Sequence, residues 1–239
     1  MKEHLVSIII PCLNEKETIL KAIEEVKRLP FKKEIVVVDN GSQDGTLTLL
    51  KEFSMLNPDL KVLCEPRKGK GNALKKGIEN SSGDYVVFQD ADLEYSPKSI
   101  QKIVTLLEDY EAVVTRRICY PYSIKLLPFI ANKFILFLFR KKYGKVPNDV
   151  FTGQRGFRRS TLLRIPICSE GFEVETELTA KMLALNVKFA ECDTLYKPRS
   201  KKIIGFKDFI KILHTFFRIA LSRKPLDSSQ LIVHPEVPR

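Results

Sequence analysis

Three carboxylates lie close together in the segment FQDADLEYSP, residues 88 to 97. Asp90, Asp92 and Glu94 directly follow the apolar run YVVF. Where a strand gives way to a loop, strict alternation ends, so Asp90 and Asp92 can both turn toward one cation. Paired oxygen ligands suit Mg²⁺ or Mn²⁺, ions that also bind a diphosphate and keep several waters. The segment predicts a metal site, and the alternative interpretation is an acidic turn in solvent.

Polar, turn-forming residues also follow the apolar runs that precede this one. PCLNE follows the first run, and DNGSQDG follows the second. In the second segment, Asp39 is placed to accept a hydrogen bond from a nucleobase N–H or a ribose hydroxyl, while Gly41 and Gly45 allow tight turns. The same segment also predicts a helix N-terminus capped by Asp44 or Ser42.

A glycine-rich segment, EPRKGKGNALKKG, follows the third run. Gly69 and Gly71 on either side of Lys70 would let backbone amides approach a phosphate at the start of the next helix. The spacing matches neither the phosphate loop of nucleotide hydrolases nor the dinucleotide-binding glycine motif. Nucleotide hydrolysis and dinucleotide redox chemistry are therefore disfavoured.

The elements that carry these segments alternate between strand and helix. Strands are predicted at 5–11, 34–39, 61–64, 84–90 and 112–116, and helices at 15–30, 46–53, 71–80 and 97–110. Such alternation predicts an α/β fold with a mostly parallel sheet and helices on both faces. Ligands of these sheets bind at the carboxyl ends of the strands, where the polar segments lie.

The alternation stops after Tyr120. Residues 122–144 are apolar but interrupted by Lys125, Pro128, Asn132 and Lys133, so we expect two short helices rather than a membrane span. Residues 205–224 predict an amphipathic helix, with apolar positions 206, 209, 210, 213, 217, 220 and 221 and polar positions 207, 211, 214, 218 and 222. Docking on the core and binding to a membrane surface both remain open for that helix.

Length and composition indicate one large domain in the cytoplasm. The chain has 239 residues and 44% hydrophobic content, which suits a single α/β domain over 1–223 followed by a tail at 224–239. Its start lacks a signal-peptide layout. The five cysteines are scattered and never spaced C-x-x-C, which favours neither a disulfide framework nor a zinc site.

The net charge of +11 points to an anionic partner. Basic residues concentrate between Lys197 and Lys224, where Asp208 is the single acidic residue. A nucleic-acid-binding module would explain this charge but not the carboxylates at 90, 92 and 94. We therefore expect no nucleic-acid partner, and instead phosphorylated metabolites or an acidic membrane surface.

Taken in order, the motifs resemble the inverting family-two glycosyltransferases, above all the branch of dolichyl-phosphate mannose synthase. The matching segments are VSIIIPCLNEKETI, IVVVDNGSQDGT, RKGKGNALKKGI, GDYVVFQDADLEYSP, GQRGFRRS and GFEVETEL, and the resemblance covers residues 5 to about 223. It implies the A-type glycosyltransferase fold, a half-Rossmann sheet. It also implies a nucleotide-sugar-binding half at 1–118, an acceptor-binding half at 119–223, and Mg²⁺ or Mn²⁺ as cofactor.

The resemblance implies roles for single residues of the nucleotide-binding half. Contacts to the nucleotide sugar are expected from Pro11, Asn14, Glu15, Asp39, Lys70, Gly71 and Asp90. Asp90 and Asp92 would form the metal motif, assisted by Glu94. The chain departs from the family in having Asn40 for a usual second aspartate and Glu94 for a usual glutamine.

The expected reaction moves a hexose from GDP-mannose or UDP-glucose, or a similar donor, to a polyprenyl phosphate such as dolichyl or undecaprenyl phosphate, with inversion. Asp92, Arg117, Glu175 and Glu177 are the candidate catalytic residues, and Arg117, Arg155, Arg199 and Lys207 are candidates to bind the acceptor phosphate. All three histidines, His4, His214 and His234, lie near the chain ends, so a histidine base is not expected. A phosphate acceptor needs no such base because it is already ionised at pH 7.

An alternative enzyme would have the same donor but a hydroxyl acceptor on a glycan or protein, with Glu175 or Glu177 as base. For the lipid acceptor we expect the protein on the cytoplasmic face of a membrane, bound peripherally. The resemblance also allows for a partner protein that anchors it there.

Overall fold

The computed structural model describes residues 4–119, 126–199 and 206–221. Side chains are described for all of these residues except 119, 126–131 and 206–208. The strands are β1 (Val6–Cys12), β2 (Lys33–Asp39), β3 (Leu60–Cys64), β4 (Tyr85–Phe88), β5 (Ala112–Cys119), β6 (Arg155–Arg158) and β7 (Phe189–Tyr196). The helices are α1 (Ile19–Lys27), α2 (Thr46–Met55), α3 (Lys70–Glu79), α4 (Ser99–Leu106), α5 (Leu126–Tyr143), α6 (Arg159–Leu162), α7 (Val174–Ala184) and α8 (Phe206–Ala220).

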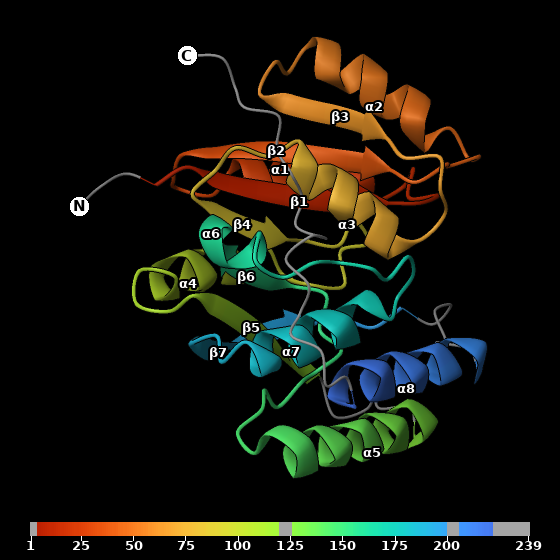
Figure 1. The fold of residues 1–239 in the computed structure, drawn as a ribbon. Helices are drawn as coiled ribbons and strands as arrows, with labels where there is room; N and C mark the ends of the chain where they lie inside the picture. The colour runs from red at the N-terminus through yellow and green to blue at the C-terminus, as the bar shows by residue number, and fades with distance from the viewer. Residues whose placement is uncertain (1–3, 120–125, 200–205, 222–239) are drawn as a thin grey trace.

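The strands form one seven-stranded sheet in the order β3-β2-β1-β4-β6-β5-β7 (Figure 1). The pairs β3–β2, β2–β1, β1–β4 and β5–β7 are parallel, whereas β6 runs antiparallel to both β4 and β5. The predicted α/β class with a mostly parallel sheet is confirmed. The carboxyl ends of β1, β2 and β4 consequently lie at one edge, where ligand sites of such sheets form.

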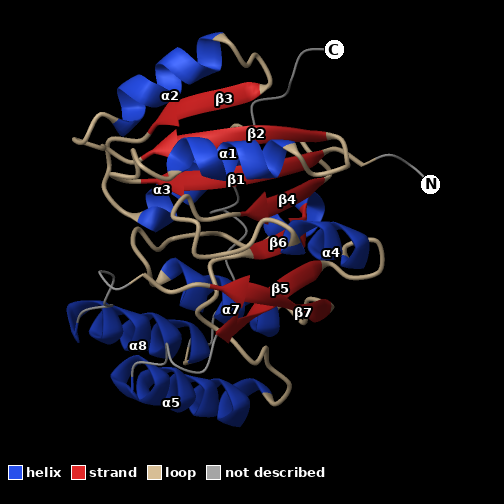
Figure 2. Cartoon of the chain, turned by 180° about the vertical axis from the view of Figure 1, so that it is seen from behind, coloured by secondary structure: helices blue, strands red, loops and turns tan. Residues whose placement is uncertain are grey.

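Helices cover both faces of the sheet, as predicted (Figure 2). Successive residues of β1 point to opposite faces because the side-chain period of a strand is two. Ile8 and Ile10 pack in a core with α1, α2 and α4, whereas Ile9 packs in a core with α3 and α7. The approach of α3 is close, since a Cβ atom on Gly77 would lie 2.4 Å from Cγ2 of Ile9. Helices packed on both faces of the sheet therefore hold the strands, and with them their carboxyl ends, in place.

A third, smaller core joins α5, α8 and the adjoining side of α7. Ile135 and Phe139 of α5 pack with Ile212 and Phe216 of α8, and α5 and α8 lie side by side at the β7 end of the molecule (Figure 1). The expectation of two short helices in residues 122–144 is wrong, because α5 is one helix. Pro128 does not break it since a proline in the first helical turn has no backbone N–H that needs a partner.

The predicted amphipathic helix is present as α8, but its buried face differs from the expected one. One face of α8 is buried, and it carries Ile212, Thr215, Phe216 and Ala220. Three residues assigned to the apolar stripe, Ile210, Phe217 and Leu221, are instead exposed by 50%, 43% and 73%. The exposed face of α8 therefore carries apolar side chains beside Lys211 and Arg218.

Two strands were not predicted. β6 has the sequence RGFR, which is short and flanked by charges, although it lies in the middle of the sheet. β7 is an edge strand with mostly half-exposed residues, so its sequence FAECDTLY lacks a buried apolar run. Both escape a search for hydrophobic periodicity.

Within the described ranges, none of the helices is long and apolar enough to span a membrane.

Candidate active site

The ends of β1 and β2 form an open pocket of about 710 Å³. Asn14, Glu15, Lys16, Glu17, Thr18, Gln43, Asp44 and Arg199 line it. Asn14 has a positive φ of 55°, and its side chain accepts a hydrogen bond from the backbone N–H of Gln43 at 2.8 Å. The hydroxyl of Ser42 accepts from the backbone N–H of Asn14 at 2.9 Å. These contacts tie the two loops into one wall of the pocket.

Asp39 ends β2 and is fully buried. Its Oδ2 accepts hydrogen bonds from the backbone N–H groups of Gly41 and Ser42, each at 3.1 Å. The thiol of Cys12 lies 3.9 Å from Oδ1, and burial, followed by the charge of Asp39, raises the pKa of that thiol. Asp39 thus shapes the turn after β2. Pro11, paired with Val38 in the same sheet edge, is partly buried.

The glycines around Lys70 serve close packing between two chain segments. A Cβ atom on Gly69 would lie 2.1 Å from the carbonyl oxygen of Glu170, and one on Gly71 would lie 2.2 Å from that of Ser169. The backbone N–H of Asn72 donates to the carbonyl of Glu170 at 3.2 Å. At Asn72 the backbone N–H is therefore engaged by the loop before α7, and the expected approach of the neighbouring amides to a phosphate stays a prediction.

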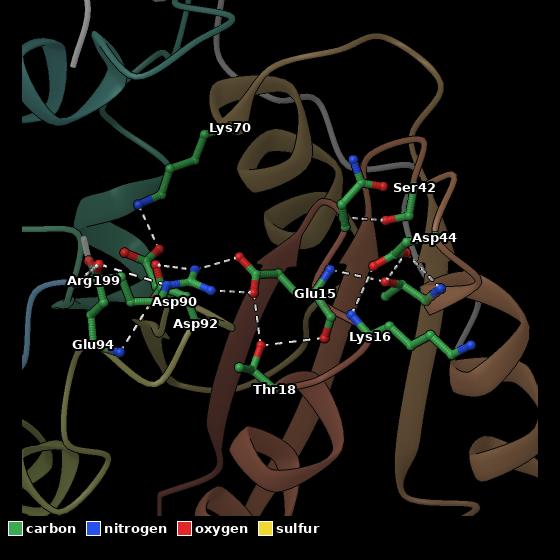
Figure 3. A network of polar contacts seen from close by, with 12 residues as sticks. Glu15, Lys16, Thr18, Ser42, Asp44, Lys70, Asp90, Asp92, Glu94 and Arg199 are labelled. Atoms are coloured by element: carbon green, nitrogen blue, oxygen red, sulfur yellow. Dashed lines mark hydrogen bonds and ion pairs between the residues drawn. The ribbon is translucent and has the colours of Figure 1, made fainter. Parts of the chain in front are cut away.

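Lys70, the first residue of α3, bridges two carboxylates. Its Nζ lies 2.6 Å from Oδ1 of Asp90 and 2.8 Å from Oε1 of Glu175, and Figure 3 shows it pointing at Asp90. Burial alone would lower the pKa of Lys70, but Asp90 and Glu175 more than offset this and raise it above its ordinary value. Lys70 is thus a fixed positive charge beside the predicted metal motif.

Arg199 contacts the other aspartate of the motif. Its guanidinium lies 3.1 Å from Oδ2 of Asp92 and forms two contacts with Glu15, at 2.7 Å and 3.0 Å (Figure 3). The side chain of Arg199 is 37% exposed, whereas that of Asp92 is 3% exposed. The hydrogen bond to Glu15 raises the pKa of Arg199 above its ordinary value, although burial opposes this. The segment after β7 thereby reaches back to the end of β1.

Glu94 binds the segment after β7, whereas we expected it to assist at the metal. Its Oε1 accepts from the backbone N–H of Arg199 at 2.8 Å, and its Oε2 accepts from the hydroxyl of Tyr196 at 2.6 Å. Its backbone carbonyl accepts from the N–H of Lys197 at 2.8 Å. Because both carboxylate oxygens are used inside the chain, we leave Glu94 out of the proposed metal ligands.

Arg117 is held by a partner that the sequence did not suggest. Its guanidinium donates to both carboxylate oxygens of Asp149, at 2.6 Å and 2.9 Å, and lies 5.1 Å from the centre of the Tyr196 ring. Burial would lower the pKa of Arg117, but Tyr95 and Asp149 raise it well above its ordinary value. No signal in the sequence linked Asp149 or Tyr196 to this site.

Two predicted site residues prove to be interior groups. Arg155 is fully buried, donates to the carbonyls of Val150 and Thr152 and the hydroxyl of Thr179, and has its pKa lowered to about 10 by burial. Glu177 is also fully buried and pairs with Lys181 at 2.7 Å.

Because interior partners engage both side chains, we exclude Arg155 from the acceptor residues and Glu177 from the catalytic ones. The side chain of Lys207 lies outside the described residues.

The residues present fit a divalent cation held jointly with a substrate. Among the described residues, no group of three or more His, Cys, Asp or Glu could hold a metal by itself. Mg²⁺ usually takes one or two carboxylates and completes its shell with substrate phosphates and water. Asp90 and Asp92 match that arrangement, and cationic groups already lie against both carboxylates.

Comparison with protein families gives a match to the model described as glycosyl transferase family 2 over residues 7–165. Glycosyltransferase AglJ of Haloferax volcanii is 29% identical, over 81% of this chain and 63% of its own length.

The names of two further relatives state a lipid phosphate acceptor. The undecaprenyl-phosphate 4-deoxy-4-formamido-L-arabinose transferase of Proteus mirabilis is 29% identical over 71% of this chain and 53% of its own length. The UDP-N-acetylglucosamine–dolichyl-phosphate N-acetylglucosaminyltransferase of Methanococcus voltae is 27% identical over 89% and 96%. The chain thus spans nearly two thirds of the length of AglJ and just over half of the length of the Proteus enzyme.

Among solved structures, the fold is similar to glucosyl-3-phosphoglycerate synthase from Mycobacterium tuberculosis in complex with Mg²⁺ and UDP. The TM-score is 0.73 at 21% identity, covering 92% of this chain and 81% of that one. This likeness supports the predicted A-type glycosyltransferase fold, and the family match covers β1 to β6 with the carboxylates at 90 and 92. The chain belongs to glycosyl transferase family 2.

Proposed function

We propose that the protein transfers a hexose from a nucleoside diphosphate sugar to a polyprenyl phosphate, with inversion and with Mg²⁺ or Mn²⁺ as cofactor. One observation carries the proposal: the carboxylates of Asp90 and Asp92 lie at the same sheet edge as the pocket between the ends of β1 and β2. Arg199 lines that pocket and contacts Asp92. A nucleotide in the pocket would have its diphosphate near the carboxylate pair.

In this proposal the donor is held by Pro11, Asn14, Glu15, Asp39, Lys70 and Gly71. Glu15 lines the pocket, and the buried carboxylate of Asp39 fixes the turn that borders it. Asp90 and Asp92 would hold the divalent cation, which as a Lewis acid neutralises charge on the departing diphosphate. Lys70 adds a fixed positive charge on the same side.

The transfer forms a bond between a phosphate oxygen of the acceptor and the anomeric carbon of the sugar. The bond from that carbon to the diphosphate breaks, and its electron pair leaves with the nucleoside diphosphate. Attack from the face opposite the leaving group inverts the anomeric configuration. The acceptor loses no proton in this step if its phosphate is already ionised, as it largely is at pH 7.

The surroundings of the site support an ionised acceptor. His4 lies beside Asp84 at 3.5 Å, His214 is exposed on α8, and His234 lies outside the described residues. Of the glutamates considered as bases, Glu177 is engaged by Lys181 and Glu175 by Lys70. Arg199 and Arg117 are the arginines we assign to the acceptor phosphate, in exchange for their present carboxylate partners.

The exposed face of α8 supports peripheral binding to a membrane. Ile210, Phe217 and Leu221 are exposed there, and Phe134 and Phe137 are exposed on neighbouring α5 by 48% and 59%. Exposed basic residues accompany them, namely Lys133, Arg140, Lys141 and Lys142 on α5 and Lys211 and Arg218 on α8. Apolar side chains mixed with cations are typical of helices that lie on anionic lipid. We propose contact with the cytoplasmic surface of a membrane, directly or aided by an anchoring partner protein.

A donor screen tests the proposed function. The purified protein is incubated with UDP- and GDP-hexoses, Mn²⁺ and a polyprenyl phosphate, and release of nucleoside diphosphate is followed. We expect one donor class to give release that requires both the metal and the lipid phosphate. Release that persists in excess chelator would contradict the metal assignment.

A further inference from the structure

Lys70 links Glu175 to Asp90. The ammonium of Lys70 lies between Oδ1 of Asp90 and Oε1 of Glu175, at 2.6 Å and 2.8 Å. The three side chains are little exposed: 10% for Lys70, 16% for Asp90 and 9% for Glu175. One lysine therefore shares its charge between a proposed metal ligand and a carboxylate from a distant helix.

Close backbone packing keeps the lysine in this place. Gly69 and Gly71 lie against the backbone of Glu170 and Ser169, so the start of α3 is locked to the loop that leads into α7. On another side, a Cβ atom added to Gly153 would come within 2.6 Å of Oδ2 of Asp90 and 2.7 Å of Nζ of Lys70.

These contacts leave the lysine little room to move away. Within this confined space, the ammonium contacts two carboxylates at once.

We propose that Glu175 is a positioning residue that shares the ammonium of Lys70 with Asp90, so that Asp90 keeps part of its negative charge for the divalent cation while Lys70 stays beside it. The inference rests on the proposed function, because it assigns a role within the same site. Without the opposing carboxylate, the lysine would pair with Asp90 alone and compete with the cation. Glu175 then affects metal binding and turnover without touching the sugar or the acceptor.

The proposal predicts opposite changes in cation affinity for two single variants. Glu175→Gln should weaken Mn²⁺ binding, because the ammonium is left to Asp90. Lys70→Met should tighten Mn²⁺ binding, because the competing charge is gone and the thioether chain fills similar space. Both variants should lower turnover. For Glu175→Gln we expect a loss of about tenfold, which is within the range of interaction energies measured between residues in contact. A general base would cost about a hundredfold to ten-thousandfold.

The test is Mn²⁺ titration of the full chain by electron paramagnetic resonance, first with Mn²⁺ alone and then with UDP or GDP added. The double variant, Glu175→Gln with Lys70→Met, separates positioning of the lysine from a direct effect of the Glu175 charge on the cation. In the Lys70→Met background, Glu175→Gln should no longer lower turnover, since there is no ammonium left to position. Glu173→Gln is the matched control, because Glu173 lies at the same helix start and accepts from the N–H of Gly171. It should leave Mn²⁺ affinity and turnover unchanged.

The outcomes are distinguishable from those of the proposed function. Opposite shifts in Mn²⁺ affinity, together with no effect of Glu175→Gln in the Lys70→Met background, support the positioning role even if the donor or acceptor class is wrong. Unchanged affinity in both variants, or weakened affinity in both, overturns it while leaving the transferase proposal intact. If Glu175→Gln does not fold, Glu175→Met takes its place in the wild-type and Lys70→Met backgrounds, and a loss of turnover that persists beside Lys70→Met overturns the role. A wild-type protein that binds no Mn²⁺ under any condition overturns both proposals.

Discussion

The two sides of the candidate site are built differently. On the proposed nucleotide side, consecutive loops after β1 and β2 bind each other, as in the contacts of Asn14 with Ser42 and Gln43. On the proposed acceptor side, charged groups far apart in the chain meet in pairs, such as Arg199 with Glu15 and Arg117 with Asp149. The nucleotide side is therefore preformed by the sheet. The proposed acceptor side is held by ion pairs, which in our proposal an anionic ligand replaces.

The largest effect is expected where the two sides meet, at Asp92. Asp92→Asn removes a charge that contacts Arg199 and that we assign to the cation, with little change in volume. We expect metal-stimulated turnover to fall by at least about a hundredfold, as for other losses of electrostatic stabilisation at a leaving group. Initial rates over a Mn²⁺ series measure this, and circular dichroism checks that the fold is kept. A variant as active as the wild type would remove Asp92 from the site.

On the acceptor side, Arg199→Gln removes an exchangeable cation. The KM for the acceptor should rise about tenfold, since a charge-assisted hydrogen bond contributes about 1.5 kcal/mol or more. Steady-state kinetics with varied polyprenyl phosphate measure it. Lys197→Gln is the matched control because Lys197 is exposed nearby and its described contact is through the backbone. Equal effects of both variants would mean that general charge, rather than Arg199, attracts the acceptor.

On the nucleotide side, Asp39→Asn should raise the KM for the donor about fivefold and change turnover little. A contact to base or ribose is made in both the ground state and the transition state, so its loss weakens binding alone. Asparagine still offers one oxygen to the N–H groups of Gly41 and Ser42. A defect confined to turnover would place Asp39 outside the donor site.

The smallest effect on turnover is expected for Glu177→Gln, which nevertheless should cost about 3 kcal/mol of stability by breaking a buried ion pair. Burial would raise the pKa of Glu177, but Lys181 and the N–H of Ser169 lower it below its ordinary value. The stabilisation is therefore present at neutral pH and is lost as the pH falls through the folded-state pKa.

Thermal unfolding against pH tests this, with a smaller loss of Tm in acid for the variant than for the wild type. A large loss of turnover at unchanged Tm would restore Glu177 as a catalytic candidate.

The same contrast explains what the sequence was able to predict. The strands and helices up to β5 follow hydrophobic periodicity, and their polar ends lie along one sheet edge as expected. Beyond β5 the sequence misleads, because β6 buries Arg155 and the edge strand β7 has no apolar run. Glu177 was a candidate catalytic residue, yet it is fully buried against Lys181. Pairs such as Arg199 with Glu15 join segments 184 residues apart, and local patterns carry no information about them.

The acceptor is the central claim and has a direct test. The purified protein is given its donor, Mn²⁺ and either a polyprenyl phosphate or the polyprenol of the same chain length, and the glycosylated lipid is measured by mass spectrometry. We predict transfer to the phosphate and none to the alcohol, because the site supplies cations for a phosphate while Glu175 and Glu177 are both engaged by lysines. Efficient transfer to the alcohol, lost in Glu175→Gln, would contradict the account and favour a hydroxyl acceptor.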